Sequence, residues 1–426
     1  MNSTSAWIKI PLGRLAKKLV NGGTPPTTIP KFWTGKIPWI TGADFTASGL
    51  GDFRRYISDE AVSSSSTNVV SKGEILIVTR TGVGKIAVTP CDVAISQDIT
   101  GFFVDKAAAD PDFLFHRLKV GVDDLKKLNQ GTSINGIIRD DLVKYEIDLP
   151  PLPAQSRIAE ILSTLDETIE HTEALIAKHR QIMAGLMHDL FTRGVTPDGK
   201  LRPTRDEAPQ LYKQSPLGWI PKEWGLAALS EVSDIRFSNV DKKSNVGERS
   251  VWLCNYMDVY ANDYITSELR FMEATCASSE IERFGVKFGD VIITKDSETP
   301  DDIGVAAVVI EDIPGLVCGY HLAMIRPDAK TVSQVFLAKQ IGTSRVASYF
   351  GRMANGSTRY GLSTDSIASL PVFLPKREEQ IQVETKLLEV DTAITHEQEH
   401  LAKLRQQKQG LMHDLLTGKV PVGVLS

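Results

Sequence analysis

The stretch "GLMHDLFTRGV", residues 185–195, occurs a second time as "GLMHDLLTGKV", residues 410–420. Working outward from it, a shift of 225 positions aligns residues 131–195 with residues 356–420 without a gap, and 22 of these 65 pairs are identical. Ordinary composition would give about four identical pairs. The chain is therefore a tandem duplication.

Each copy contains a long stretch in which apolar residues recur at alternating spacings of four and three. This spacing predicts a long helix with a coiled-coil seam, and two such helices in one chain are expected to pair antiparallel. The predicted seam comprises Ile158, Leu162, Leu165, Ile169, Ile176, Met183, Leu186 and Leu190 in the first copy, and Val383, Leu387, Val390, Ile394, Leu401, Leu404, Leu411 and Leu415 in the second. The polar breaks Thr172, His179, Glu397 and Lys408 either set the register or are tolerated near solvent.

Two globular α+β units, each a mixed β-sheet with helices, are expected beside these helices, related by a pseudo-two-fold. Short apolar runs predict strands at 75–79, 86–89, 291–294 and 305–310, and longer patches predict helices at 112–128 and 332–350. The expected order is a first domain (1–150), a helix (151–192), a linker (193–215), a second domain (216–375), a helix (376–418) and a tail (419–426). The linker is rich in Pro and charge, which predicts an extended, solvated segment.

Composition places the chain among soluble globular proteins. It has 426 residues, of which 42% are hydrophobic and 24% charged. No apolar run approaches the length of a membrane span, and the first residues lack the pattern of a secretory signal, so a cytoplasmic protein without membrane contact is expected. The four cysteines lie far apart without CxxC spacing, which predicts reduced thiols and no zinc site.

The net charge of −5 argues against a simple nucleic-acid binder. The distribution of charge points the other way, because residues 1–43 and 329–364 contain no Asp or Glu while carrying Lys and Arg beside aromatic residues. Such windows suit contacts to phosphates and bases. Solvated faces balanced by acids elsewhere are the open alternative.

Several motifs together carry a family resemblance. "NGGTPPTTIPKFWTGKIPWITGADF" from position 21, "GEILIVTRTGVGK" from 73, "QGTSINGI" from 130, "LPPLPAQSRIAEILSTLDETI" from 149 and "LPVFLPKREEQ" from 370 resemble the specificity subunit of Type I restriction-modification systems. The resemblance covers essentially the whole chain. The second domain departs from it at its start, where neither GGTP nor IPW appears.

The resemblance implies a subunit without chemistry or a cofactor of its own. Two target-recognition domains would each read one half of a gapped, non-palindromic sequence in double-stranded DNA, held apart by the two helices. Two modification subunits with methyltransferase activity would bring S-adenosylmethionine, and restriction subunits would bring ATP- and magnesium-dependent translocation and cleavage.

The DNA contacts are expected on turns that carry Arg, Lys, Asn, Ser, Thr, His or aromatic side chains. The candidates are Thr24, Trp33, Trp39, Thr41, Arg80, Thr81, Lys85, Ser133 and Asn135 in the first domain, and Asn255, Tyr256, Lys295, His321, Ser357, Arg359 and Tyr360 in the second. Packing, a turn or solvent exposure is the alternative for each. Trp39 in particular also fits a core position, because it follows Pro38 into an apolar strand.

No constellation typical of an enzyme is found. The glycine turn ending at Lys85 is similar to a phosphate-binding loop, but Ile86 stands where the magnesium-binding hydroxyl should be and no helix follows. The two His-Asp pairs at 188–189 and 413–414 lie near helix ends, where His meets the negative end of the helix dipole. Neither a catalytic nor a metal site is expected, and a structural adapter that binds no DNA is the alternative function.

Overall fold

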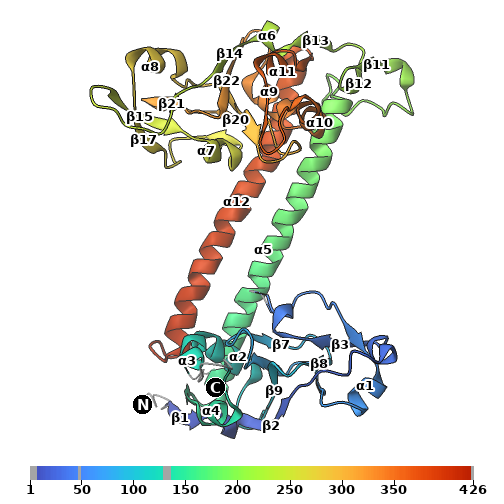
Figure 1. Cartoon of the computed structure of the whole chain (residues 1–426), viewed down its shortest axis with the longest axis vertical. Coiled ribbons are helices and arrows are strands. Elements are labelled where there is room, and N and C mark those ends of the chain that lie inside the picture. The colour runs from blue at the N-terminus through green and yellow to red at the C-terminus, as the bar shows by residue number, and fades with distance from the viewer. Residues whose placement is uncertain (1–6, 47–48, 128–135, 424–426) are drawn as a thin grey trace. The chain divides into compact units, whose positions relative to one another are not determined.

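The computed structural model describes residues 7–46, 49–127 and 136–423. The chain forms two compact units, Met1–Ala174 with Gln398–Ser426, and Leu175–Glu397. Two long helices, α5 (Leu152–Thr192) and α12 (Arg377–Leu416), each contribute to both units (Figure 1). The predictions of two long helices and of mixed α and β structure are confirmed.

The first unit is built from short strands and short helices. Its strands are β1 (Ile8–Pro11), β2 (Ala16–Asn21), β3 (Ile37–Ile40), β4 (Tyr56–Ile57), β5 (Asn68–Val70), β6 (Ile75–Val78), β7 (Ile86–Val88), β8 (Val93–Ile95), β9 (Ile99–Val104) and β10 (Glu146–Leu149). Its shorter helices are α1 (Asp59–Ser63), α2 (Pro111–Val120), α3 (Val122–Lys127) and α4 (Arg139–Lys144), with 3-10 turns η1 (Leu12–Leu15), η2 (Pro30–Trp33) and η3 (Gly42–Asp44).

The position of strand β6 in the fold explains why its sequence is apolar without interruption. It is an inner strand of the sheet β2-β9-β6-β7, which lies beside a second sheet, β4-β3-β8-β5. Ile75 and Ile77 belong to the core that contains α2 and the start of α5, whereas Leu76 and Val78 belong to the core shared with the second sheet. Because side chains alternate along a strand, a sheet covered on both faces requires apolar residues at every position.

The second unit repeats this plan with additions. Its strands are β11 (Tyr212–Ser215), β12 (Gly218–Pro221), β13 (Gly225–Ala228), β14 (Ser233–Phe237), β15 (Arg249–Cys254), β16 (Tyr264–Ile265), β17 (Met272–Cys276), β18 (Val291–Thr294), β19 (Asp296–Ser297), β20 (Ala306–Val309), β21 (Leu316–Cys318), β22 (Leu322–Pro327), β23 (Tyr360–Gly361) and β24 (Pro371–Leu374). Its shorter helices are α6 (Leu229–Val232), α7 (Tyr256–Tyr260), α8 (Ser278–Phe284), α9 (Gln334–Ile341), α10 (Ser344–Met353) and α11 (Thr364–Ala368), with the 3-10 turn η4 (Pro209–Leu211).

Strand pairing extends the duplication over parts of the chain where the sequences match only in outline. The order β2-β9-β6-β7 in the first unit corresponds to β14-β22-β18-β20 in the second. Strand β3 pairs with β8 in parallel, as β15 does with β21, and β1 pairs with β10 antiparallel, as β13 does with β24. The two units are therefore copies of one fold.

A glutamine at the start of each long helix attaches that helix to the globular part of its unit. The side-chain oxygen of Gln155 accepts a hydrogen bond of 2.9 Å from the backbone N–H of Asp110, and its amide donates to the carbonyl five residues earlier at 2.8 Å. Gln380 makes the same two bonds, with the N–H of Ser333 at 2.8 Å and again with the carbonyl five residues earlier. Both glutamines are almost fully buried. The repeated Gln is therefore an internal anchor.

The two long helices pair antiparallel within the first unit. Arg405 of α12 forms an ion pair of 2.6 Å with Glu173 of α5, and Lys408 pairs with Asp166. Residue numbers thus fall along one helix as they rise along the other. In the second unit Leu190, Val383 and Leu387 belong to one core.

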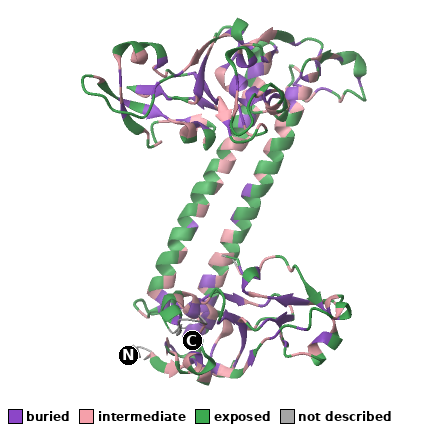
Figure 2. Ribbon diagram, viewed as in Figure 1, coloured by how far each residue is buried: buried purple, intermediate pink, exposed green. Residues whose placement is uncertain are grey.

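Most of the predicted seam is sheltered from solvent, although the middle of both helices is exposed over much of its surface (Figure 2). The buried seam residues are Ile158, Leu162, Thr172, Ile176, Leu190, Val383, Leu387, Leu404 and Leu415. Thr172 is tolerated because its hydroxyl donates to the carbonyl of Thr168 at 2.8 Å, inside the same helix. The placement of Leu411 in the seam is wrong, because this residue is exposed.

The segment after α5 differs from the expected solvated linker. Arg202 is buried and forms a bidentate ion pair with Glu379 at 2.5 and 2.9 Å, and the same carboxylate accepts from the Trp224 indole at 3.1 Å and from the Val195 backbone N–H at 2.9 Å. Tyr212 is also buried. A sequence window shows the charges of such a segment but not the largely buried carboxylate of Glu379, 177 positions from Arg202, that pairs with this arginine.

Helix prediction also failed at two glycines. The predicted helix at 112–128 is two helices, α2 and α3, separated at Gly121, and the one at 332–350 is α9 and α10, separated at Gly342. No helix among residues 7–46, 49–127 and 136–423 is long and apolar enough to cross a membrane. All four cysteines are free, and three of them are buried.

Replacing Gln380 with Ala tests the anchor. The change leaves the Ser333 N–H without its partner in a buried position, so the free energy of unfolding should fall by about 1–3 kcal/mol. Urea denaturation measures this loss. Gln406→Ala, at an exposed position of α12, is the matched control, and an equal effect of both changes would contradict the anchor.

His116 is a buried titratable group of the first unit. Its Nε2 lies 4.0 Å from an oxygen of Asp166, and its Nδ1 has no hydrogen-bond partner. Burial lowers the pKa of His116 to about 4, against the opposing effect of Asp166. The folded protein therefore holds this ring neutral where the unfolded chain would protonate it.

Stability should consequently depend on pH. Below the unfolded pKa of about 6.5 the unfolded chain binds a proton that the folded chain does not, so stability is lost as the pH falls toward 4, by about 2 kcal/mol between pH 7 and pH 5. Urea midpoints at the two pH values measure the effect. His116→Gln should abolish most of it, whereas His171→Gln, at an exposed site, should not. Equal pH dependence in all three proteins would be evidence against His116.

Candidate nucleic-acid interface

Three segments of the second unit meet where β18 ends. The backbone N–H of Lys295 donates to the carbonyl of His321 at 3.0 Å, and the Lys295 carbonyl accepts from the N–H of Leu362 at 2.8 Å. The end of the strand is thus held between the turn that precedes β22 and the loop that contains β23. Predicted contact residues from all three segments are brought together here.

A carboxylate lies at the centre of this group. Asp296 accepts from Nη2 of Arg359 at 2.6 Å with one oxygen, and its other oxygen lies 2.6 Å from Nδ1 of His321. Lys295 lies over the ring of Tyr320, with its ammonium 4.6 Å from the ring centre. Asp296 is largely buried, whereas Arg359 and Tyr320 are exposed. The result is a rigidly held group of cations and a ring facing solvent.

His321 has a strained backbone. Its φ is 74°, the only positive φ of a residue other than glycine in the described parts of the chain. Such a conformation costs about 1–3 kcal/mol and persists only where the surroundings enforce it. The contact of 2.6 Å between Nδ1 of His321 and Asp296 and the backbone bond to Lys295 hold the turn in place.

The remaining candidates of the second unit lie at the start of α7 or in the loop that contains β23. Asn255 begins α7, and its backbone N–H donates to Asp258 at 2.7 Å. Tyr256 stacks on Tyr260 with ring centres 5.5 Å apart; burial raises the pKa of Tyr256, against hydrogen bonds with residues of β18 and β19. Ser357 is exposed, and Tyr360 lies in β23, paired with β19.

The first unit has the same backbone arrangement with other side chains. The backbone N–H groups of Thr79 and Arg80 donate to the carbonyl of Asp98 at 2.8 and 3.3 Å, and the Thr79 carbonyl accepts from Ile137 at 2.7 Å. Arg80 is exposed, and the hydroxyl of Thr81 donates to Asp98 at 3.4 Å. Two copies of one backbone frame therefore present different groups.

The glycine turn beside Arg80 is a hairpin. Gly82 and Gly84 have φ of 87° and 91°, a region that side chains other than glycine rarely adopt, which explains both glycines without a bound nucleotide. Lys85 donates to the carbonyl of Gly42 at 2.9 Å. Lys85 therefore ties two loops together.

Two threonine candidates have partners within the protein. Thr24 donates to the side chain of Gln97 at 2.5 Å. Thr41 caps η3. Its hydroxyl and its backbone N–H both donate to the same oxygen of Asp44. Burial by itself would raise the pKa of Asp44, but hydrogen bonds from Thr41 and Arg54 outweigh this effect and lower the pKa.

Trp39 occupies the alternative core position and not a position from which its ring could contact DNA. Trp39 is 3% exposed, and its indole N–H donates to the carbonyl of Gly23 at 3.0 Å. Trp33 is half-buried and packs edge-on against it, with ring centres 5.1 Å apart. Trp39 forms a small core with Phe32 and Ile57, against which Trp33 packs. Ser133 and Asn135 lie outside the described residues.

Several residues of the frame were missed by sequence reasoning. These are Gln97 and Asp98 in the first unit, and Asp296 and Tyr320 in the second. For Gln97, Asp98 and Tyr320 the signal was the turn between two short apolar runs, which recurs with a shift of 223 positions, whereas Asp296 follows the apolar run 291–294. That shift differs from the 225 of the aligned repeat, so a gap-free comparison does not find it.

One cation of the acid-free window 329–364 is structural. The ammonium of Lys339 lies 2.7 Å from Asp391 and 2.9 Å from Asp263. Burial tends to lower the pKa of Lys339, but the two carboxylates outweigh it and raise the pKa. Absence of acids in the sequence around a lysine thus does not make it available to a ligand. In the described parts of the chain, no group of three or more His, Cys, Asp or Glu could hold a metal ion.

Comparison with known proteins gives one consistent answer. A family model described as the Type I restriction modification DNA specificity domain matches residues 4–178. The Type I restriction enzyme MjaVIII specificity subunit of Methanocaldococcus jannaschii is 22% identical over 420 residues, covering 98% of this chain and 93% of the relative. The EcoR124I/EcoR124II specificity subunit of Escherichia coli is 30% identical over 162 residues, 36% of this chain and 40% of the relative.

Solved structures agree at the level of the fold. The S subunit of the Type I restriction-modification system from M. genitalium has a TM-score of 0.60 and 17% identity, with 97% of each chain covered. A chain from a study of complex assembly and conformational transition of the type I R-M system has a TM-score of 0.55 and 17% identity, covering 96% of this chain and 97% of that one.

A core role for Trp39 is testable through stability. Trp39→Ala should lower the free energy of unfolding by about 3–5 kcal/mol, because it leaves a cavity beside Trp33 and removes a buried ring. Trp252→Ala, at an exposed position, is the control and should cost less. Unchanged stability of the Trp39 variant together with weaker DNA binding would restore Trp39 as a direct contact.

Proposed function

Because a family model of the Type I restriction modification DNA specificity domain matches residues 4–178 and a specificity subunit is similar over 98% of this chain, we propose that the chain is the sequence-reading, non-catalytic component of such a system. Each unit would read one half of a bipartite target in double-stranded DNA. Modification subunits carrying S-adenosylmethionine, two in number, and restriction subunits using ATP and magnesium would act where this chain directs them. The cytoplasm is the expected location.

The observation that best supports this proposal is the repeated frame of three segments at the end of β6 and of β18. Two backbone bonds recur in both units, while the side chains at equivalent positions differ: Thr79 and Asp98 in one, with Arg80 next to them, and Lys295 and His321 in the other. Arg, Lys and His donate to base edges and phosphates. Equal frames with unequal side chains suit a target whose two halves differ. Two continuous helices shared by both units suit halves separated by a constant number of base pairs.

Single substitutions should separate the two half-sites. Arg80→Ala should relax preference within one half of the target, and Lys295→Ala within the other, each by about 1–3 kcal/mol of discrimination against a wrong base if the side chain reads that base. The measurement is selection of bound duplexes from a library randomised over both halves, using the assembled complex. Lys403→Ala, an exposed cation on α12, should leave both halves unchanged.

Affinity as a function of salt tests the function as a whole. A DNA-reading complex loses affinity steeply as ionic strength rises, because each neutralised phosphate releases counterions. A structural adapter would show no such binding. If the assembled complex does not bind duplex DNA at low salt, the proposal falls. If it binds but Arg80→Ala and Lys295→Ala leave both preferences intact, these two residues are not readers.

A further inference from the structure

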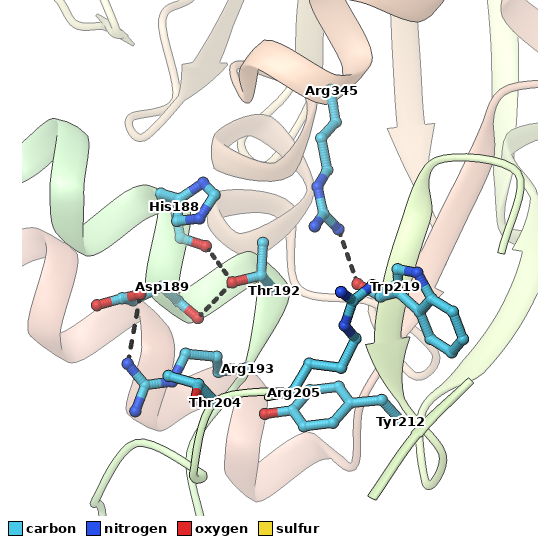
Figure 3. Close-up of a pocket in the computed structure, with 9 residues that line it drawn as sticks. All are labelled: His188, Asp189, Thr192, Arg193, Thr204, Arg205, Tyr212, Trp219 and Arg345. Carbon is cyan, nitrogen blue, oxygen red and sulfur yellow. Dashed lines mark hydrogen bonds and ion pairs between the residues drawn. The ribbon is translucent and has the colours of Figure 1, made fainter. Parts of the chain in front are cut away.

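A cation-rich cavity of about 250 Å³ lies in the second unit beside the end of α5 (Figure 3). Of the 9 residues that line it, Arg193, Arg205 and Arg345 are arginines and Asp189 is the single carboxylate. Asp189 is already paired with Arg193 at 3.5 Å. The other two arginines therefore face the cavity without a balancing acid inside it.

Arg345 is the most unusual of these residues. Its guanidinium donates to the carbonyl of Trp219 at 3.0 Å, and no carboxylate within the described ranges forms an ion pair with it. Burial lowers the pKa of Arg345. The guanidinium of Arg205 lies over the ring of the same tryptophan, 5.1 Å from the ring centre, and pairs only with exposed Asp206 at 3.5 Å. Two cations thus approach one residue although like charges repel.

The position of Arg345 in its helix is also unfavourable. It is the second residue of α10, where unpaired backbone N–H groups make the helix end positive. The preceding Thr343 provides no side-chain cap, since its hydroxyl donates to the carbonyl of Gln340. The corresponding helix of the first unit, α3, has Asp123 and Asp124 in its first turn. The fold itself therefore does not require a cation here.

The cavity continues to the start of α10. A neighbouring cavity of about 260 Å³ shares His188, Thr192 and Arg345 with it and is also lined by Thr343 and Ser344. Backbone donors at a helix start, together with arginine side chains, form an arrangement that binds phosphate or carboxylate. An anion at this place would offset the charge repulsion and the unfavourable helix end together.

We propose that this pocket, defined by Arg345, Arg205 and the start of α10, binds one phosphate of the DNA backbone outside the bases being read. The inference rests on the proposed function. Helix α10 has the pocket at its first residues and continues into the loop that carries Arg359. Ten helical residues span about 15 Å, which equals four to five base-pair steps of about 3.4 Å. The contact therefore adds affinity and register without reading sequence.

The first experiment compares Arg345→Met and Arg205→Met in the full chain assembled with its partner subunits. Each variant should bind the target duplex about tenfold more weakly, with the slope of log affinity against log salt reduced by about one and with unchanged sequence preference. Arg270→Ala, an exposed arginine outside the pocket, is the control. Arg345→Lys should retain most of the salt slope, because the charge is kept. Arg205 is largely exposed, so its variant tests the pocket even if Arg345→Met fails to fold.

The second experiment identifies the phosphate. Duplexes with a single neutral methylphosphonate, scanned over ten positions, should show one position within about five base pairs of the Arg359 half-site that weakens the unaltered complex but has no further effect on Arg345→Met. Altered base preference, or an unchanged salt slope in both Met variants, would overturn the proposal. Loss of subunit assembly with unchanged DNA affinity would assign the pocket to a carboxylate of a partner and overturn it too. Failure of the proposed function looks different, since the unaltered complex would then not bind duplex at all.

Discussion

The fold depends on how each globular part is fastened to a long helix. A buried glutamine amide satisfies a backbone N–H and a backbone carbonyl at the same point of both copies, through Gln155 and Gln380. Side-chain entropy and desolvation make a buried polar residue costly unless all its groups are paired. Because these amides are paired, the loops that follow the strands are carried on a fixed frame.

This frame separates what the duplication kept from what it changed. Backbone hydrogen bonds at the ends of β6 and β18 are the same in both units, since they depend on strand pairing and not on side-chain identity. The side chains at those ends are free to differ, so Lys295 stands in the second unit where Thr79, followed by Arg80, stands in the first. A duplicated fold with different side chains at the ends of β6 and β18 can recognise a target whose two halves differ. Among the described residues, the positive φ of His321 and the arginine in the first turn of α10 both occur in the second unit.

The candidate site could be predicted only in part. Arg80, Lys295, His321 and Arg359 followed from basic or titratable side chains on turns, and the structure brings the last three together around Asp296. Trp39 did not fit this logic, because it lies in the apolar strand β3 and its ring is buried in the core. The lack of acidic residues around Lys339 in the sequence also wrongly suggested that this lysine is available to a ligand. Its two carboxylate partners are 76 and 52 positions away and come near it only when the chain folds.

The sequence by itself determined the duplication, the two long helices and the alternation of apolar strands with turns. These are local or periodic properties, since helix and strand spacing is set by backbone geometry and appears in any window of the chain. Tertiary structure alone decided that the segment after α5 packs around Glu379, that Trp39 lies inside, and that Arg345 faces a cavity whose single carboxylate, Asp189, is paired with Arg193. Each of these depends on which residues, distant in sequence, come into contact. Burial and charge pairing are set by those contacts and not by the residue type alone.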